Sequence, residues 1–210
     1  MSLILHGAPL SPYVTAIRAA LAEKSVPYRF APIGPEDLKT PEYGKMHPFR
    51  KLPVLDADGR MIYETAAILR YVDEGFDGPS LQPQAAVARA LSEQWMSVAN
   101  SYLYGIIFTG LVFPRLFAPK LGLPTDETAI NRSAEIADDY VGILAAALSA
   151  GTLGVSQHPT IGDLLVAAVM LPLSGIAEGR RILAEYPEFG AWLLKMSSRP
   201  SFAQQEVTDV

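Results

Sequence analysis

The sequence predicts a two-domain α+β fold, in which a small mixed domain precedes an all-helical one. Over the first third of the chain, short strand-like apolar segments alternate with segments of helical periodicity, whereas beyond residue 84 only helical periodicity is found. The two parts are separated by a run rich in glycine, proline and other turn-forming residues. We therefore expect a first domain at 1–75, a linker at 76–84 and a helical domain at 85–210.

The elements of the first domain follow the order β-α-β-α-β-β-α. Val14, Ile17 and Leu21 lie at helical spacing in the first helix, and the two last strands are joined by the hairpin turn Ala57-Asp58-Gly59. The expected ranges are 3–5, 12–24, 28–32, 36–46, 54–56, 60–63 and 64–74.

The second domain is predicted to be a helical bundle. Gly110 and Pro114 are expected to bend or break its long first helix. Thr160-Ile161-Gly162-Asp163 has the pattern of a capping box, for which a structural role of Asp163 is favoured. The expected helices are 85–117, 125–150, 160–172, 178–186 and 187–197.

Composition excludes several classes of function. A net charge of −5 without a run of Lys or Arg argues against binding nucleic acid through a basic surface. The chain has no cysteine, which excludes a disulfide, a thiolate metal site and a cysteine nucleophile, so any reacting sulfur must come from the ligand. Without a signal peptide or about 18 uninterrupted apolar residues, a cytoplasmic protein that does not enter a membrane is expected. His6, His47 and His158 lack the spacing of metal ligands, so no metal is expected.

Three short motifs could carry chemistry. Ser11-Pro12-Tyr13 opens the first helix, where a serine either caps a backbone N–H or stabilises a ligand thiolate beside the helix N-terminus. Leu52-Pro53-Val54 places a proline at the start of a strand. Glu64-Thr65 opens another helix, where such residues are common for structural reasons and where a carboxylate ligand is also stabilised.

Together, these motifs and the element order resemble a cytosolic glutathione S-transferase over nearly all 210 residues. The segment His6 to Arg18 is similar to the serine-type members of bacteria and plants, because His6 stands where tyrosine-type members have their tyrosine. The resemblance implies a thioredoxin-like first domain, glutathione as co-substrate and a homodimer.

The resemblance also implies roles for individual residues. Ser11 would stabilise the glutathione thiolate, with Tyr13 and Thr15 as competing donors. A cis Pro53 beside Leu52 would let an extended peptide pair with the backbone of Val54.

The two ends of the tripeptide need further partners. Glu64 would face the ligand ammonium and Thr65 the γ-glutamyl carboxylate, whereas Lys39 and Lys51 are the candidates for the glycyl carboxylate. The chain departs from the family at His47-Pro48-Phe49-Arg50-Lys51, where Asn-Pro-x-Gly-Lys or Asn-Pro-x-Gly-Gln is usual. Arg50 removes the backbone freedom of glycine and adds a charge near the glycyl end.

The electrophile is expected in an apolar pocket between the domains. Aromatic residues at helical spacing also occur in ordinary cores, so a core role is the alternative for most of the candidate wall residues. The candidates are Leu10, Tyr13, Tyr102, Tyr104, Phe108 and Phe113.

The resemblance thus implies a transferase that activates the thiolate of glutathione through Ser11 and conjugates it to a small hydrophobic electrophile. One alternative keeps the fold and glutathione but changes the reaction to reduction of peroxides or disulfides, dehalogenation or ether cleavage. Another is a non-catalytic binding or assembly module, although such modules commonly lose the ligand motifs that this chain keeps.

Overall fold

The structure is a computed structural model that describes residues 2–154 and 158–203. Residue 1 and, within the predicted helical domain 85–210, segments 155–157 and 204–210 lie outside the described residues. The described chain divides into two compact units, the first made of 2–81 with 200–203 and the second of 82–199.

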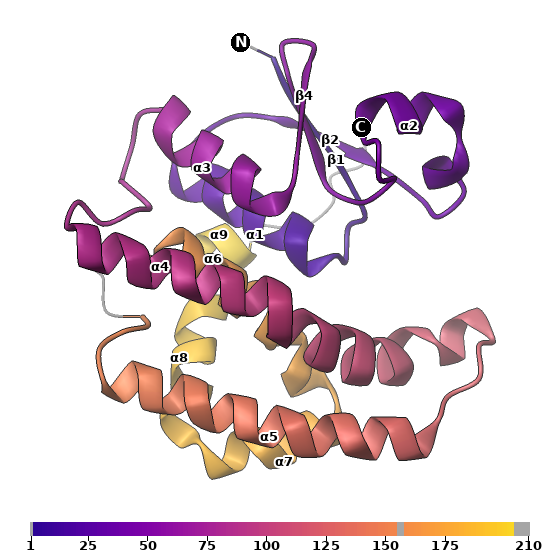
Figure 1. Cartoon of the computed structure of the whole chain (residues 1–210), viewed down its shortest axis with the longest axis vertical. Helices are drawn as coiled ribbons and strands as arrows, with labels where there is room; N and C mark the ends of the chain where they lie inside the picture. The colour runs from indigo at the N-terminus through magenta and orange to yellow at the C-terminus, as the bar shows by residue number, and fades with distance from the viewer. Residues whose placement is uncertain (1, 155–157, 204–210) are drawn as a thin grey trace. The chain divides into compact units, whose positions relative to one another are not determined.

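The first unit contains a four-stranded sheet of strand order β2-β1-β3-β4, in which β1 is parallel to β2 and antiparallel to β3. Helices α1 and α3 pack against each other on one face of this sheet, and α2 lies on its other side (Figure 1). The order β-α-β-α-β-β-α is therefore confirmed. The elements are β1 (Leu3–Gly7), α1 (Pro12–Glu23), β2 (Arg29–Pro32), η1 (Asp37–Lys39), α2 (Pro41–Met46), β3 (Val54–Ala57), β4 (Arg60–Tyr63) and α3 (Thr65–Gly75).

A buried ion pair fastens the end of α1 to the end of α3. The Lys24 ammonium donates a hydrogen bond to the Asp73 carbonyl at 2.8 Å and lies 3.5 Å from its carboxylate, with side chains only 3% and 6% exposed. The same carboxylate accepts the Leu81 N–H at 2.6 Å, which holds the segment after α3 in place. The short helix α9 (Pro200–Ala203) packs on α1, where the Ser201 hydroxyl donates to the Glu23 carboxylate at 2.6 Å.

Every regular element in the described residues of the second unit is a helix, as predicted. All ten residues of α6 are buried, and the capping box at Thr160 and Asp163 is present, with Asp163 also accepting the Gly154 N–H at 2.8 Å. Asp163 therefore has the structural role expected of it. The elements are α4 (Ala86–Val98), η2 (Ala99–Phe117), η3 (Pro119–Leu121), α5 (Glu127–Ser149), α6 (Ile161–Met170), η4 (Leu171–Gly175), α7 (Ala177–Glu185) and α8 (Pro187–Ser197).

Of the bend or break expected at Gly110 and Pro114, the break is contradicted, because the long first helix of this unit continues through both residues. It runs without interruption from α4 into η2, which is wound as a π-helix, and the Ala118 N–H donates five residues back to the Phe113 carbonyl. In an α-helix the proline ring would collide with the carbonyl four residues earlier, whereas the wider π winding hydrogen-bonds five residues back.

Length and composition alone would allow this helix to cross a membrane. It has 32 residues and contains a window of mean hydropathy 1.4, of which 33% is buried. The core helix of a globular unit can have the same length and hydropathy, and here η2 packs along both α5 and α6. Its buried positions include Leu103, Ile107 and Leu111.

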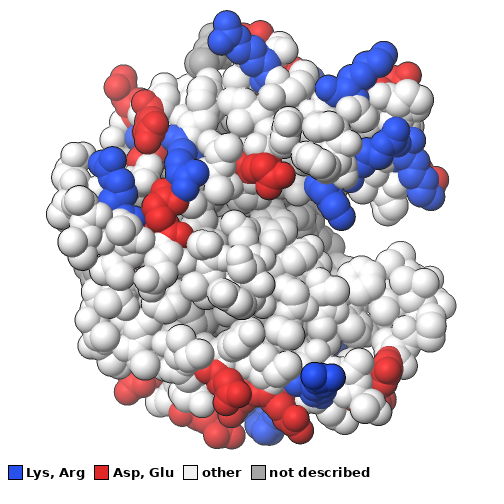
Figure 2. All heavy atoms as spheres, in the orientation of Figure 1, with Lys and Arg blue, Asp and Glu red and all other residues white. Residues whose placement is uncertain are grey.

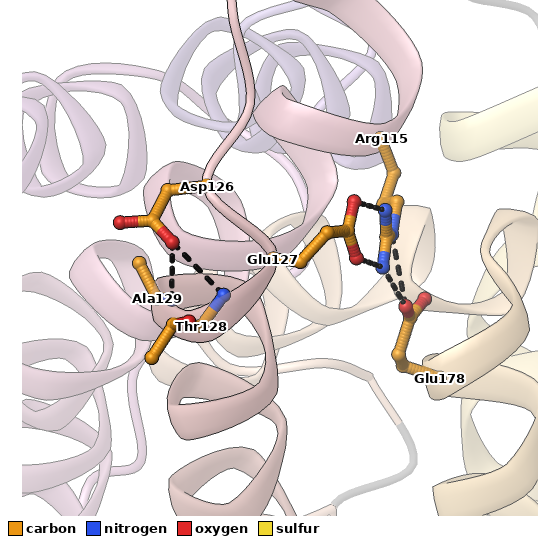
Figure 3. Close-up of polar contacts among 6 residues, drawn as sticks. All are labelled: Arg115, Asp126, Glu127, Thr128, Ala129 and Glu178. Carbon is orange, nitrogen blue, oxygen red and sulfur yellow. Dashed lines mark hydrogen bonds and ion pairs between the residues drawn. The ribbon is translucent and has the colours of Figure 1, made fainter.

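An arginine between two carboxylates ties η2 to the starts of α5 and α7 (Figure 3). Arg115 donates to both Glu127 oxygens at 2.7 and 2.8 Å, and to Glu178 at 2.6 and 2.8 Å. The hydrogen bond from Arg115 lowers the pKa of Glu127, and it lowers that of Glu178 against the opposing effect of burial. Asp126 caps α5 beside them by accepting the Thr128 and Ala129 N–H groups.

Candidate functional site

Ser11 stands immediately before α1, with an extended backbone (φ −74°, ψ 126°). Its N–H donates to the Ala8 carbonyl at 3.0 Å and its carbonyl accepts from Thr15 at 2.9 Å, but its hydroxyl caps no N–H of the helix. The interpretation of Ser11 as a side-chain cap is therefore wrong. Its half-buried hydroxyl lies at the N-terminus of a 12-residue helix, where backbone N–H groups favour a negative charge.

The residues around Ser11 differ in their exposure and in their interactions within the protein. Tyr13 and Thr15, the competing donors, are half-buried and both take part in interactions within the protein. Leu10, one of the candidate wall residues, is 70% exposed in the loop before Ser11.

The loop between α2 and β3 is anchored at both ends of its turn. The Arg50 N–H donates to the His47 carbonyl at 2.9 Å, and the Tyr43 hydroxyl donates to the Lys51 carbonyl at 2.7 Å. Burial raises the pKa of Tyr43 to about 12, so this hydroxyl keeps its proton at any physiological pH. The Leu52–Pro53 peptide bond that follows is cis, as the resemblance implied.

The structure changes which residue of the Leu52-Pro53-Val54 motif could pair with a peptide. Val54 lies opposite His6 of β1 and Tyr63 of β4, so a strand already lies on each side of it and it offers no open edge. Leu52 precedes the strand, and its N–H and C=O have no backbone partner among the described residues. The prediction that a peptide pairs with Val54 is thus corrected to Leu52, because only a residue outside the ladder has free backbone groups.

Glu64 and Thr65 lie at the N-terminus of α3, where no described side chain caps the backbone N–H groups. Glu64 adopts a left-handed backbone (φ 72°, ψ 117°), a conformation that is costly for a residue other than glycine and is often found at functional sites. Its side chain is exposed and caps no N–H of α3. Thr65 is buried, and its hydroxyl has no hydrogen-bond partner among the described residues. The first turn of α3 can therefore receive a carboxylate.

Positive side chains gather over the α2 end of the first unit (Figure 2). Lys39, at the end of η1, is exposed and pairs with Glu36 at 2.7 Å. Lys51 is exposed, and among the described residues its ammonium has no hydrogen-bond or ion-pair partner. Both predicted cations are therefore exposed, and they lie on different segments of the unit.

His47 belongs to the site region, although sequence reasoning gave it no role beyond its unusual occurrence in place of asparagine. It is 2% exposed, its Nδ1 accepts the Phe49 N–H at 3.2 Å, and its ring centroid lies 4.7 Å from that of Tyr63. Burial lowers the pKa of His47, Lys51 lowers it further, and Glu64 acts in the opposite direction. The neutral imidazole therefore joins the loop to the end of β4.

We expect acid to destabilise the protein partly through His47. Because its pKa is lower in the folded chain, the unfolded chain binds the proton more readily, and stability is lost as pH falls below about 6.5. His47→Asn keeps an acceptor for the Phe49 N–H but does not titrate, so its Tm should fall less between about pH 7 and 5. Burial lowers the pKa of His6 too, so the Tm of His47→Asn should still depend on pH to some extent.

Thermal unfolding of both proteins across this pH range measures the difference. His158→Asn, at an exposed position, serves as the control and should leave the dependence unchanged. A His47→Asn protein with the full acid sensitivity of the wild type would contradict the prediction.

Most of the candidate aromatic residues form one stripe along η2. Tyr104, Phe108, Phe113 and Phe117 follow at intervals of four or five residues, close to one turn of a π-helix (about 4.4 residues). Their ring centroids lie 5.3 Å (Tyr104–Phe108), 5.9 Å (Phe108–Phe117) and 5.9 Å (Phe113–Phe117) apart. All four are half-buried, so they do not form an ordinary core. Sequence reasoning missed Phe117, which the π-helical spacing would have identified.

Tyr102 and Phe113 differ from the rest of the predicted wall. Tyr102 is 57% exposed and outside the stripe. Phe113 also lines a cavity of about 220 Å³ between η2 and the start of α5, together with Pro114 and Ile130. Among the described residues, no group of three or more His, Asp or Glu could hold a metal ion.

Comparisons with known proteins agree with this architecture. Residues 5–80 match the family model for the glutathione S-transferase N-terminal domain. Glutathione S-transferase F10 of Arabidopsis thaliana is 30% identical over 169 residues, covering 79% of this chain and 78% of the relative. Glutathione S-transferase 3 of Zea mays is 28% identical over 205 residues, covering 94% and 90%.

Solved structures show the same fold. Glutathione transferase F7 of Populus trichocarpa superposes with a TM-score of 0.85 at 26% identity, covering 97% of each chain. The apo form of glutathione S-transferase III gives 0.86 at 27% identity, covering 98% of this chain and 95% of the other. With its βαβαββα unit, its helical second unit and these relatives, the chain belongs to the glutathione S-transferase family of enzymes.

Proposed function

We propose that this enzyme stabilises the thiolate of glutathione through Ser11 and transfers it to a small hydrophobic electrophile. The observation that carries the proposal is the Ser11 hydroxyl, which stands at the N-terminus of α1 without serving as its cap. A free thiol has a pKa of about 8.5, and each unit by which it falls requires about 1.4 kcal/mol of preference for the thiolate. One hydroxyl donor and the field of the helix are together of this size.

The rest of the tripeptide would lie along the segment that precedes β3 and extend to the start of α3. The free backbone groups of Leu52, beside Pro53, support pairing with the cysteinyl part. The open first turn of α3 and the Thr65 hydroxyl would bind the γ-glutamyl carboxylate, with Glu64 near the ammonium. The ammonium groups of Lys39 and Lys51 would bind the glycyl carboxylate.

For the electrophile, the aromatic stripe of η2 is the favoured surface. Half-buried rings that stack on one another also stack on planar apolar molecules, and Tyr104 and Phe108 are parallel to within 21°. From family membership we also propose a homodimer in the cytoplasm that needs no metal.

Titration of the bound thiol tests the proposal. With saturating glutathione, thiolate absorbance should rise at a pH at least one unit below about 8.5, the pKa of the free thiol. S-methylglutathione, which has no ionisable thiol, should compete for the site and remove the signal. A bound thiol that titrates like free glutathione would refute the role of the helix start.

A further inference from the structure

Arg50 occupies a backbone conformation that favours glycine. Its φ is 53°, in the left-handed region, directly after the turn closed by the hydrogen bond from its N–H to the His47 carbonyl. A side chain at such a position is unfavourable and persists only where surrounding contacts hold it. The contacts of this side chain therefore need an explanation.

The Arg50 side chain reaches across α2 to the end of η1. Its Nη1 donates to the Lys39 carbonyl at 2.5 Å and lies 3.3 Å from the Leu38 carbonyl. The guanidinium lies against Gly44 of α2, where an added Cβ would come within 3.3 Å of Nη2. The absence of a side chain at Gly44 thus leaves room for this crossing.

This contact joins the two segments that carry the candidate cations. Lys51 follows Arg50 directly, and its carbonyl is held by the Tyr43 hydroxyl at 2.7 Å. Lys39 provides the carbonyl that Arg50 binds. Arg50 and Tyr43 therefore fix the backbone of both lysines relative to α2.

We infer that Arg50 is a positioning residue for the carboxylate end of the thiol peptide: it fixes the spacing of Lys39 and Lys51 so that both ammonium groups reach one carboxylate. The inference rests on the proposed function, since it concerns the glycyl end of bound glutathione. Arg50 is exposed, so water screens its own charge, and its effect comes from the two carbonyls that it holds.

The test compares glutathione with γ-glutamylcysteine, which has the same thiol and γ-glutamyl group but lacks the glycine. Arg50→Gly removes the contact with η1 and puts at φ 53° the residue that adopts it most readily. We expect the ratio of kcat/KM for glutathione over γ-glutamylcysteine to fall about fivefold, the scale of one exposed ion pair. The fall should lie in KM for glutathione, with kcat at saturation and Tm not lowered.

Lys45→Ala is the matched control, because it removes an exposed positive charge from α2 that is not part of the contact. It should leave the ratio unchanged. An equal loss with both thiols in Arg50→Gly, or the same fall in Lys45→Ala, would overturn the inference while the enzyme remains a glutathione transferase. A wild-type protein that turns over neither thiol would overturn the proposed function and this inference with it.

Discussion

Ser11→Ala should lower kcat/KM for conjugation about 10- to 100-fold near neutral pH. A hydrogen bond to a charged group contributes about 1.5–3 kcal/mol, which corresponds to about one to two pKa units of the bound thiol. The hydroxyl does not cap α1, so its removal leaves the stability of the helix unchanged. Stopped-flow turnover with a chromogenic electrophile, combined with the pH titration of the bound thiol, measures both consequences.

Two further variants separate Ser11 from its neighbours. Ser11→Thr keeps a hydroxyl and should recover much of the activity. Thr15→Ala removes the hydroxyl of a competing donor one turn along the helix and should leave the pKa of the bound thiol unchanged. The opposite result would contradict the role of Ser11: if the thiol bound to Ser11→Ala has the wild-type pKa while the thiol bound to Thr15→Ala does not, the Thr15 hydroxyl stabilises the thiolate.

Lys24→Met should destabilise the protein by about 3–5 kcal/mol, because it leaves the buried Asp73 carboxylate without its cation. The Leu81 N–H would remain as a partner of that carboxylate, and the hydrogen bond to the Asp73 carbonyl would be lost. Urea unfolding at neutral pH gives the change in the free energy of unfolding. A loss below about 1 kcal/mol, the size expected of an exposed pair, would contradict it.

An exposed ion pair and a double variant provide the controls for this prediction. Glu36→Gln breaks the exposed pair with Lys39 and should cost about 0–1 kcal/mol. The double variant Lys24→Met with Asp73→Asn leaves no buried charge and keeps an acceptor for the Leu81 N–H. It should therefore be more stable than Lys24→Met alone.

The helical half shows where local patterns suffice and where they fail. The capping box at Thr160 and Asp163 depends on residues within one turn, and it is present as predicted. Pro114 was expected to bend or break its helix, because the rule for proline assumes α-helical winding. The π winding of η2 removes that conflict and aligns four aromatic side chains, a result that depends on packing against α5 and α6.

The candidate site shows the same contrast. Ser11, Pro53, Glu64 and Thr65 could be named from the sequence because each stands at the end of an element that local periodicity places. That Leu52, and not Val54, has free backbone groups for a peptide could not be predicted from the sequence, because it depends on β3 lying between β1 and β4. Likewise, the sequence marks Arg50 as unusual, but only the folded loop brings its guanidinium to the carbonyl of Lys39.

The sequence by itself determined the order of the elements, the two-part organisation and the helix starts that can receive anions, because these depend on residues close together in the chain. The tertiary structure alone decided which backbone groups stay unpaired, that Arg50 joins the segments of the two lysines and how the aromatic stripe forms. Those properties are set by neighbours distant in sequence, whose approach depends on how the whole unit packs.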